Sequence, residues 1–287
     1  MAKAPEGREK RVQAIYFSPT GTTRRILSCM ADNVGLKAAP QIDLTLPSKR
    51  DSFTGKVDGH LVLVGSPVYA GTIPLPFFES LRRIRGKGEW AVPVAVYGNR
   101  SPDTAVEELT KILRGRGFRV LATAAFIGQH SFATPEHPWG MGRPDEADMK
   151  AAAEFGRAVG EKYGRRPAEI SVPGLLLERF SNKMVEELPE GYHSKVLERP
   201  RELWWISLSD KVVCTQCNRC VDSCPVAAMD AESFGIDDGK CIRCMACVRS
   251  CPTGKMRIVY SDAPSALERF ANLDKIFAVR KEPKTML

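Results

Sequence analysis

Residues 214–225 read CTQCNRCVDSCP, and residues 241–252 read CIRCMACVRSCP. In each run three cysteines stand three positions apart, a fourth follows four positions later, and a proline comes next. The second run repeats the first at an offset of 27 residues, which indicates an internal duplication. Three thiols at this spacing gather on one tight turn of backbone, so the fourth ligand to a common centre has to come from elsewhere in the chain. The runs therefore predict a duplicated module that holds inorganic centres.

This spacing resembles that of bacterial ferredoxins, in which the fourth cysteine of each run ligates the cluster of the other run. The resemblance implies two [4Fe–4S] clusters with crossed ligands. The first set is Cys214, Cys217, Cys220 and Cys251. The second set is Cys241, Cys244, Cys247 and Cys224. A zinc site and a disulfide framework are the alternatives, but zinc ligands usually come as two separated pairs, and disulfide frameworks are typical of small secreted domains.

The length and composition predict a globular protein of about two domains, with 287 residues of which 43% are hydrophobic. The ninth cysteine, Cys29, lies outside the runs in a helical apolar pattern, as expected of a small buried hydrophobe. The polar start MAKAPEGREKR lacks the apolar stretch of a secretory signal, and no run approaches the roughly 18 apolar residues of a membrane span. We therefore expect a cytoplasmic protein with no membrane span.

The first 165 residues alternate between strand-like and helix-like patterns. This alternation predicts a doubly wound parallel sheet covered by helices on both faces. Pro93 removes a backbone donor, so we expect it at the first position of its strand. Asp103 is the expected N-cap of the helix that follows. The expected strands are 11–17, 41–46, 61–64, 92–97 and 120–127, and the expected helices are 22–34, 75–84, 103–115 and 145–163.

The first expected strand runs into Ser18-Pro19-Thr20-Gly21-Thr22-Thr23. Clustered hydroxyls and free N–H groups at a helix N-terminus favour an anion, and Gly21 allows a close backbone approach. No lysine follows as in a Walker loop, so a monophosphate fits better than a nucleoside triphosphate. An ordinary helix cap is the alternative interpretation of such a turn.

The pattern Ser-x-Thr-Gly-x-Thr after a first strand resembles the FMN-phosphate loop of flavodoxins. Residues 65–71 and 97–100 resemble the second and third flavodoxin loops, which border the isoalloxazine. The resemblance implies a flavodoxin-like five-stranded sheet of order 2-1-3-4-5, with FMN at the carboxyl ends of the strands. The chain departs from small flavodoxins in its basic charge and in Gly128-Gln129-His130-Ser131-Phe132 after the last strand.

The residues expected at the flavin site come from these three loops. Tyr69 is expected to stack on the isoalloxazine, with Tyr97 opposite it or in ordinary packing. Arg100 would place positive charge near the flavin or lie in solvent. His130 is the one candidate for proton delivery, with a hydrogen bond to backbone as the alternative. The full set is Ser18, Thr20, Gly21, Thr22 and Thr23 at the phosphate, Ser66, Pro67, Val68, Tyr69, Ala70 and Gly71 in the second loop, and Tyr97, Gly98, Asn99 and Arg100 in the third.

The formal net charge of +8 counts the cysteines as neutral. Each oxidised cluster with its four thiolates carries about −2, and a flavin phosphate adds about −2, so the loaded protein would carry about +2. No RNP motif or interleaving of aromatic and basic residues supports nucleic-acid binding, so we expect none. A basic surface favours an acidic redox partner protein through electrostatic steering.

A flavodoxin-like module followed by a two-cluster module resembles the fused flavodoxin–ferredoxin proteins of anaerobes. We expect four segments: a flavodoxin-like FMN-binding domain at 1–165, a connector with short helices at 166–208, a small α+β ferredoxin-like domain with two [4Fe–4S] clusters at 209–260, and a C-terminal helix and tail at 261–287.

The resemblance implies an electron-transfer protein that passes electrons between the clusters, FMN and an external redox partner. An FMN-dependent reductase of a quinone, a nicotinamide or another small acceptor is the alternative, and it would make the chain an oxidoreductase. A redox sensor is the third interpretation. No dinucleotide fingerprint of the G-x-G-x-x-G type is present, which disfavours a dedicated NAD domain.

Overall fold

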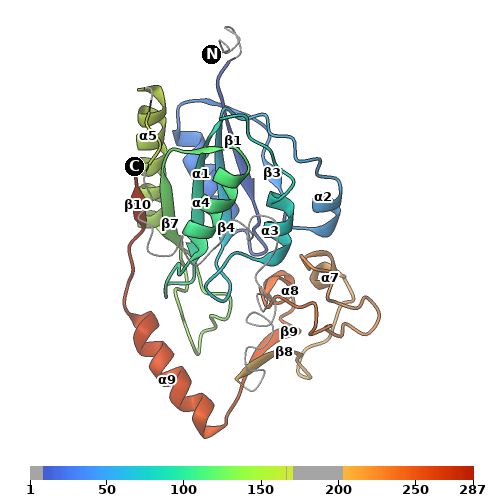
Figure 1. Cartoon of the computed structure of the whole chain (residues 1–287). Helices are drawn as coiled ribbons and strands as arrows, with labels where there is room; N and C mark the ends of the chain where they lie inside the picture. The colour runs from blue at the N-terminus through green and yellow to red at the C-terminus, as the bar shows by residue number, and fades with distance from the viewer. Residues whose placement is uncertain (1–8, 166, 171–202) are drawn as a thin grey trace.

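The structure is a computed structural model that describes residues 9–165, 167–170 and 203–287 (Figure 1). A sheet layered by helices forms the larger part of the molecule, and the two cysteine runs form a smaller part beside it. The predicted connector helices, together with His193, lie largely outside the described residues. Within the described part, no helix combines the length and the apolar character needed to cross a membrane.

The central sheet is parallel and has the flavodoxin-like order. Its core strands are β1 (Arg11–Tyr16), β4 (Leu61–Pro67) and β5 (Trp90–Tyr97). On one side β1 pairs with β2 (Lys37–Ala38) and β3 (Ile42–Asp43), and on the other β5 pairs with β6 (Arg119–Val120) and β7 (Thr123–Ile127). If β2 and β3 are counted as one interrupted strand, and β6 and β7 as another, the order of the parallel strands is 2-1-3-4-5. This order confirms the predicted fold class.

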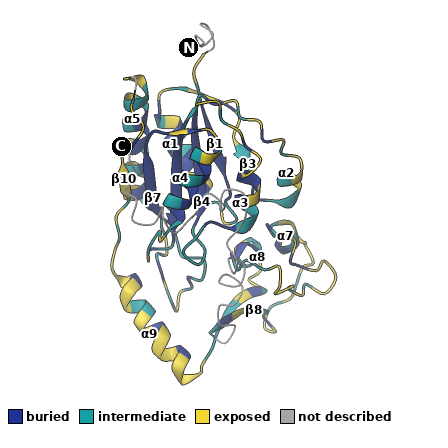
Figure 2. Ribbon diagram, viewed as in Figure 1, coloured by how far each residue is buried: buried dark blue, intermediate teal, exposed yellow. Residues whose placement is uncertain are grey.

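Helices cover both faces of this sheet. One face carries α1 (Thr22–Asn33) and α5 (Glu146–Gly164), whose apolar side chains join a core with Leu61 and Leu63 of β4. The other face carries α3 (Leu75–Leu81) and α4 (Ala105–Gly115), which pack on Val62 and Val64. Because alternate residues of β4 face opposite cores, the whole strand is buried (Figure 2). A short helix, α2 (Pro47–Asp51), lies between β3 and β4 in the chain.

Three local predictions were wrong for identifiable reasons. Pro93 lies inside β5 and not at its start. The backbone N–H and C=O groups of odd-numbered residues in β5 point toward β6 and β7, and the pairing with these strands is interrupted between Val120 and Thr123. The N–H that proline lacks is therefore not needed for a hydrogen bond at this position. The strand expected at 41–46 is shortened to β3, and the separate short β2 precedes it, with Pro40 between the two. Asp103 does not cap α4, since it has a φ of 44° and pairs with Arg100, and Thr104 is the N-cap residue.

The two cysteine runs have the same local structure. Helix α7 (Arg219–Asp222) begins after the second cysteine of the first run and contains the third, and α8 (Ala246–Ser250) occupies the same place in the second run. Gln216 and Asn218 have positive φ angles, and so do Arg243 and Met245, their counterparts 27 residues on. The equivalent Ser223 and Ser250 hydroxyls hydrogen-bond to each other at 2.9 Å. Strands β8 (Trp204–Leu208) and β9 (Met256–Tyr260) pair antiparallel beside this duplicated unit.

The chain then returns to the larger part. Helix α9 (Pro264–Ala278) packs Phe270 and Phe277 against Trp139, which agrees with the amphipathic pattern of this segment. The last strand, β10 (Lys284–Met286), adds to the sheet antiparallel to β7 (Figure 1). This sixth position in the sheet was not predicted, because the tail has no alternation of apolar and polar residues.

A buried ion pair fastens the loop before α5. The guanidinium of Arg143, with a side chain 8% exposed, forms a bidentate bond with the carboxylate of Asp148, which is 0% exposed. Asp148 also closes a capping box with Asp145 at the start of α5. Arg143 donates further to the carbonyl of Lys281, so the same pair holds the returning tail.

We predict that Asp148→Ala lowers the free energy of unfolding by about 3–5 kcal/mol, because the buried Arg143 charge loses its bidentate partner and keeps only a contact of 3.6 Å with Asp145. Urea denaturation of the full chain measures this change. The matched control is Glu146→Ala, an exposed acidic residue in the same helical turn, which should change the stability by about 0.5 kcal/mol or less. Equal effects of the two substitutions would contradict this role of the pair.

Candidate cofactor cleft and cysteine centres

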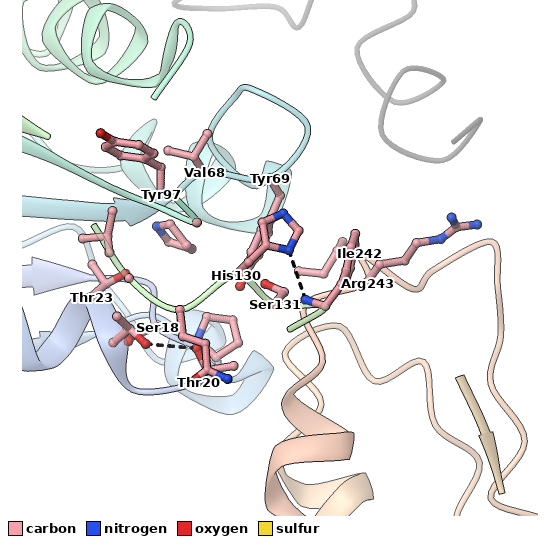
Figure 3. A pocket seen from close by; sticks show the side chains of 18 of the residues that line it. Ser18, Thr20, Thr23, Val68, Tyr69, Tyr97, His130, Ser131, Ile242 and Arg243 are labelled. Atoms are coloured by element: carbon pink, nitrogen blue, oxygen red, sulfur yellow. Dashed lines mark hydrogen bonds between the residues drawn. The ribbon is translucent and has the colours of Figure 1, made fainter. Parts of the chain in front are cut away.

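The carboxyl ends of β1, β4, β5 and β7 open into one cleft of about 710 Å³, counted together with its solvent-filled mouth (Figure 3). The structure brings the first two predicted loops and part of the third to this cleft. It adds the segment at 128–132 and two residues of the second cysteine run. The lining residues are Ser18, Pro19, Thr20, Thr22, Thr23, Pro67, Val68, Tyr69, Ala70, Val96, Tyr97, Gly98, Gly128, Gln129, His130, Ser131, Phe132, Ile242 and Arg243.

The first loop turns sharply into α1. Gly21 has a φ of 80°, which favours glycine, and its N–H closes the turn on the carbonyl of Ser18 at 3.1 Å. The hydroxyl of Ser18 accepts a bond from the N–H of Arg24, whereas the hydroxyls of Thr20 and Thr22 lie 3.4 Å apart at the cleft. N–H groups in the first turn of a helix lack intrahelical acceptors. This end of α1 can therefore hold an anion with neutral donors.

The second loop presents Tyr69 on a tight hairpin. The backbones of Tyr69 and Thr72 bond to each other in both directions, with Ala70 at a φ of 58° and Gly71 at 87° between them. Two positive φ angles define a type I′ turn, and a left-handed alanine is uncommon. Tyr69 projects from this hairpin toward Ile242 and Ser131 (Figure 3). Ser66 is fully buried and bonds to the carbonyl of Pro67, so its hydroxyl serves the loop itself.

A buried carboxylate supports this hairpin from behind. Glu108 of α4 accepts bonds from the hydroxyls of Thr72 and Thr104, at 2.5 and 2.7 Å, and from the N–H of Ile73 at 3.0 Å. Burial raises the pKa of Glu108 above its ordinary value, and the three donated bonds oppose that rise. The position of Tyr69 therefore depends on the carboxylate of Glu108 behind the hairpin, and burying this carboxylate costs desolvation free energy.

The side chains of the third loop make most of their contacts with other parts of the protein and few with the cleft. Tyr97 is 3% exposed and packs in the core under α3 and α4. The side-chain amide of Asn99 donates to the carbonyls of Phe277 and Val279 at 2.9 and 3.1 Å, and its oxygen accepts from the N–H of Lys281. Arg100 pairs with Asp103 at 2.9 Å and does not line the cleft. Asn99 thus fastens the C-terminal segment.

His130 lies between Gly98 and a set of aromatic rings. A Cβ atom on Gly98 would come within 2.5 Å of the imidazole, so only glycine fits there. The Nδ1 atom of His130 accepts a bond from the N–H of Phe132 at 3.2 Å, which places the proton of the neutral ring on Nε2. The ring meets Phe132, Trp139 and Phe277 edge to face at centroid distances of 4.9 to 5.5 Å.

Ile242 and Arg243 reach the cleft from the second cysteine run, and sequence reasoning missed both. They stand between Cys241 and Cys244, and Ile242 packs against the core that underlies the Tyr69 hairpin. The one signal in the sequence was the apolar side chain of Ile242 between two expected ligands, because an apolar residue in a short turn indicates packing against another part of the protein. Hydrogen bonds hold both runs in place: Arg50 donates to the carbonyl of Pro225 in the first run at 2.6 Å, and Arg249 in the second run donates to the carbonyl of Ala133 at 2.9 Å.

Seven of the eight thiols of the runs fall into two groups by their mutual electrostatic interactions. Cys220 interacts with Cys214 and Cys251. Cys241, Cys244 and Cys247 interact with one or more of the others and with Cys224. The fourth cysteine of each run thus lies near cysteines of the other run, as the expected crossed ligand sets require. The electrostatic interaction with Cys220 also raises the pKa of Cys247, so the two groups are neighbours.

The two groups differ in the exposure of their second cysteine, since Cys244 is buried and Cys217 is exposed, whereas the third cysteines, Cys247 and Cys220, are both buried. Cys244 and Cys247 are buried, and burial raises the pKa of Cys247 to about 12 and that of Cys244 further. In the first group Cys217 is exposed, and the N–H of Arg219 lowers the pKa of its thiol. We name the group of Cys241, Cys244, Cys247 and Cys224 the inner group, and that of Cys214, Cys217, Cys220 and Cys251 the outer group.

Both groups are suited to iron–sulfur ligation. Backbone N–H groups point at the sulfur atoms of Cys214, Cys224 and Cys251, at distances of 3.4, 3.2 and 3.5 Å, and such bonds stabilise cluster sulfur. Buried thiols with raised pKa values ionise when a metal cation binds, because the cation supplies the missing positive charge. Among the described residues, no three His, Cys, Asp or Glu side chains gather closely enough for a single metal ion.

Comparisons with known proteins add a family to one part of the chain. Residues 207–252 match the family model described as a 4Fe-4S dicluster domain. No curated protein matches the chain. Among solved structures, the chain is similar to a flavodoxin from the domain Archaea, with 15% identity over 54% of this chain and 99% of that one, and a TM-score of 0.40.

Two larger proteins are similar over the same region. Rubredoxin:oxygen oxidoreductase of Desulfovibrio gigas is 16% identical over 54% of this chain and 36% of its own, with a TM-score of 0.41. The flavodiiron protein of Giardia intestinalis is 20% identical over 54% of this chain and 36% of its own, with a TM-score of 0.38. The strand order and the family model together confirm a flavodoxin-like part followed by an iron–sulfur dicluster domain.

We predict that Glu108→Gln changes how stability depends on pH. A raised pKa in the folded state means that the folded protein takes up this proton before the unfolded chain does. As the pH falls from 7 toward the ordinary value of 4.5, the wild type should therefore gain unfolding free energy relative to the variant. Urea denaturation across this range measures the difference, with the exposed Glu79→Gln as control. A constant difference would show that Glu108 carries no such shift.

Proposed function

We propose that the chain is an electron-transfer protein that holds FMN in the cleft, one [4Fe–4S] cluster at the inner group and another at the outer group. FMN exchanges one or two electrons and each cluster exchanges one, so such a chain joins one-electron and two-electron carriers. One observation carries the proposal: Ile242 and Arg243, between two inner-group cysteines, line the same cleft as Thr20, Thr22 and Tyr69. The covalent and physical connection favours transfer between the sites.

Different residues of the cleft would hold different parts of FMN. The hydroxyls of Thr20 and Thr22 and the first-turn N–H groups of α1 would hold the phosphate. Tyr69 offers an aromatic ring at the opposite part of the cleft, on a hairpin that Glu108 keeps in place. Burial raises the pKa of Tyr69 well above its ordinary value, and the neighbouring charge of Cys244 raises it further, so the phenol stays neutral. Tyr69 therefore stands between the cleft and the inner group.

The outer group would exchange electrons with a partner. Its Cys217 is exposed, whereas the inner cysteines Cys244 and Cys247 are buried beside the cleft. The chain carries a formal net charge of +8, and a basic protein attracts an acidic one. We propose an acidic redox partner and a cytoplasmic location, where thiols stay reduced. The proposed segments are a flavin domain at 1–165, a connector at 166–208, a cluster domain at 209–260 and a helix with tail at 261–287.

A reductase acting on a small organic acceptor is the second candidate function. A further cavity adjoins the flavin cleft and shares His130 with it, so a small molecule could lie beside the cofactor. Steady-state oxidation of a chemical reductant with a quinone acceptor separates the two functions, because a pure carrier turns over no small acceptor at a saturable site.

We predict that the double variant Thr20→Val/Thr22→Val binds FMN about 30- to 900-fold more weakly, because each of the two lost bonds to a charged phosphate contributes about 1–2 kcal/mol. Flavin fluorescence titration of the flavin-free chain measures the affinity. Riboflavin, which lacks the phosphate, is the matched control ligand, and its affinity should change little. An equal loss for both flavins would mean that the loop does not hold the phosphate.

We predict that the crossed ligand sets govern iron content. Protein purified without oxygen should carry about eight irons per chain, four for each cluster. Cys214→Ala/Cys251→Ala removes two ligands of the outer group and should leave about four irons. Cys214→Ala/Cys224→Ala damages both groups and should leave almost none. Iron and sulfide assays on the two double variants compare equal numbers of lost thiols.

The opposite pattern, with more iron left in Cys214→Ala/Cys224→Ala, would show that each run forms its own centre. Zinc in place of iron in the wild type would end the cluster assignment. A third double variant tests the route of electrons. With only the inner group damaged, as in Cys224→Ala/Cys247→Ala, a protein donor should still reduce the outer cluster, while flavin reduction slows.

A further inference from the structure

Two neighbouring loops carry a dense set of basic residues at the edge of the central sheet where its strands begin. One loop follows α3 and spans residues 82–89, and the other runs from the last turn of α4 into β6, at 111–119. Together they hold eight arginines and lysines and a single acidic residue, Glu89. The cysteine runs lie beyond the opposite, carboxyl edge of the sheet (Figure 1). We name residues 82–89 and 111–119 the basic edge.

Backbone hydrogen bonds hold the two loops of the basic edge together. The N–H of Gly86 donates to the carbonyl of Arg116 at 2.7 Å, and the N–H of Gly88 donates to that of Gly117 at 3.0 Å. A Cβ atom on Gly117 would come within 2.5 Å of the carbonyl oxygen of Gly86, so this close approach requires glycine. Like charges on the two loops repel each other. The fold therefore gathers cations whose mutual repulsion a bound anion would relieve.

The cations in the middle of the basic edge are available to an external anion. Arg85, Lys87 and Arg119 are exposed, and none of them forms an ion pair within the described part of the chain. Arg85 donates to backbone carbonyls of its own loop, and Arg119 lies over the ring of Trp90 at 3.8 Å. The carboxylate of Glu89 accepts a bond from the N–H of Lys87. These contacts hold two guanidinium groups at the surface, where they can bind phosphate oxygens.

The needs of the fold account for only part of this charge. A helix C-terminus carries about half a negative charge and favours a cation in its last turn. Two helices, α3 and α4, end at the basic edge, so they balance about one positive charge. The ion pair of Arg114 with Glu169 at 2.8 Å and the carboxylate of Glu89 balance two more. Most of the positive charge therefore remains for a partner.

The side chains of the basic edge fit one kind of partner better than others. None of the large exposed apolar side chains of the described residues lies on it, whereas the core of a stable protein interface is apolar. Its ring at Phe118 is buried, and the adjoining Trp90 already stacks with Arg119, so neither ring is free to stack on a nucleic-acid base. A layer of headgroup phosphates requires only exposed cations spread over a broad surface.

We infer that the basic edge is a docking surface for anionic lipid headgroups, by which the protein adsorbs to a membrane without entering it. The contact is electrostatic, because the basic edge exposes cations and no large apolar side chain. On a protein adsorbed in this way, the cysteine runs would lie on the side away from the membrane, open to a redox partner. The inference goes beyond the proposed electron transfer, and the binding requires no cofactor.

Sedimentation with lipid vesicles tests the inference on the full chain, purified without oxygen. Vesicles of phosphatidylcholine with about one third phosphatidylglycerol should bind the protein, and vesicles of phosphatidylcholine alone should not. Each arginine or lysine at such a surface strengthens adsorption about fivefold. The triple variant Arg85→Gln/Lys87→Gln/Arg119→Gln should therefore bind the anionic vesicles about 100-fold more weakly.

A matched control removes three charges outside the basic edge. Lys150→Gln/Arg257→Gln/Lys275→Gln changes three exposed residues and should weaken binding less than about threefold, because salt screens charges farther than about 8 Å from the headgroups. A charge-keeping variant, Arg85→Lys/Arg119→Lys, separates charge from packing. It should bind the anionic vesicles within about twofold of the wild type.

Three results would overturn the inference. The first is equal binding of the wild type to the two kinds of vesicle, and the second is an equal loss of binding in the two triple variants. The third is binding of duplex DNA in place of the anionic vesicles at the same salt concentration, which would assign the basic edge to nucleic acid. Iron and flavin contents of the same samples report the proposed function separately. A chain that adsorbs to vesicles but holds neither cofactor would contradict that function and leave the docking surface standing.

Discussion

The arrangement of the molecule depends on the contact between the turn at Cys241–Cys244 and the carboxyl edge of the sheet. Ile242 contributes an apolar side chain to the core beneath the Tyr69 hairpin, and Arg243 lies over the ring of Trp204 at 5.0 Å. Backbone carbonyls near the runs accept bonds from Arg50 and Arg249, which fix the orientation. Because this turn also carries two inner-group thiols, packing and chemistry are inseparable here. A shift of the turn would move the thiols away from the cleft.

Local features of the fold and site could be predicted from sequence, and features created by docking could not. The turn at Ser18–Thr23 is specified by hydroxyls and one glycine within six residues, so its place before α1 was foreseeable. The interior position of Pro93 depends on an interruption in a neighbouring strand about 30 residues away. Ile242 reaches the cleft only through the packing of one part on another. The edge strand β10 pairs with β7 from more than 150 residues away.

Several polar groups near the cleft hold the scaffold and do not face it. Asn99 follows a strand of the sheet, a position typical of ligand contacts, yet its amide is fully occupied by the backbone around Phe277 and Lys281. Glu108 is buried under the hairpin and orders Thr72 and Ile73. Such groups explain how an uncommon turn with a left-handed Ala70 is maintained. Their chemistry alone gives no hint of whether they touch a ligand or the chain.

The hydrogen bond between Ser223 and Ser250 marks the axis that relates the two cysteine runs. A duplication of this kind begins with two equivalent halves, and identical ligands in identical surroundings would give identical redox midpoints. The neighbouring sheet domain breaks that equivalence, because it covers Cys244 and leaves its counterpart Cys217 in water. Solvent exposure and hydrogen bonding are main determinants of cluster midpoints. Asymmetric docking onto a symmetric unit thus gives the two cysteine groups different surroundings without any change in the ligands.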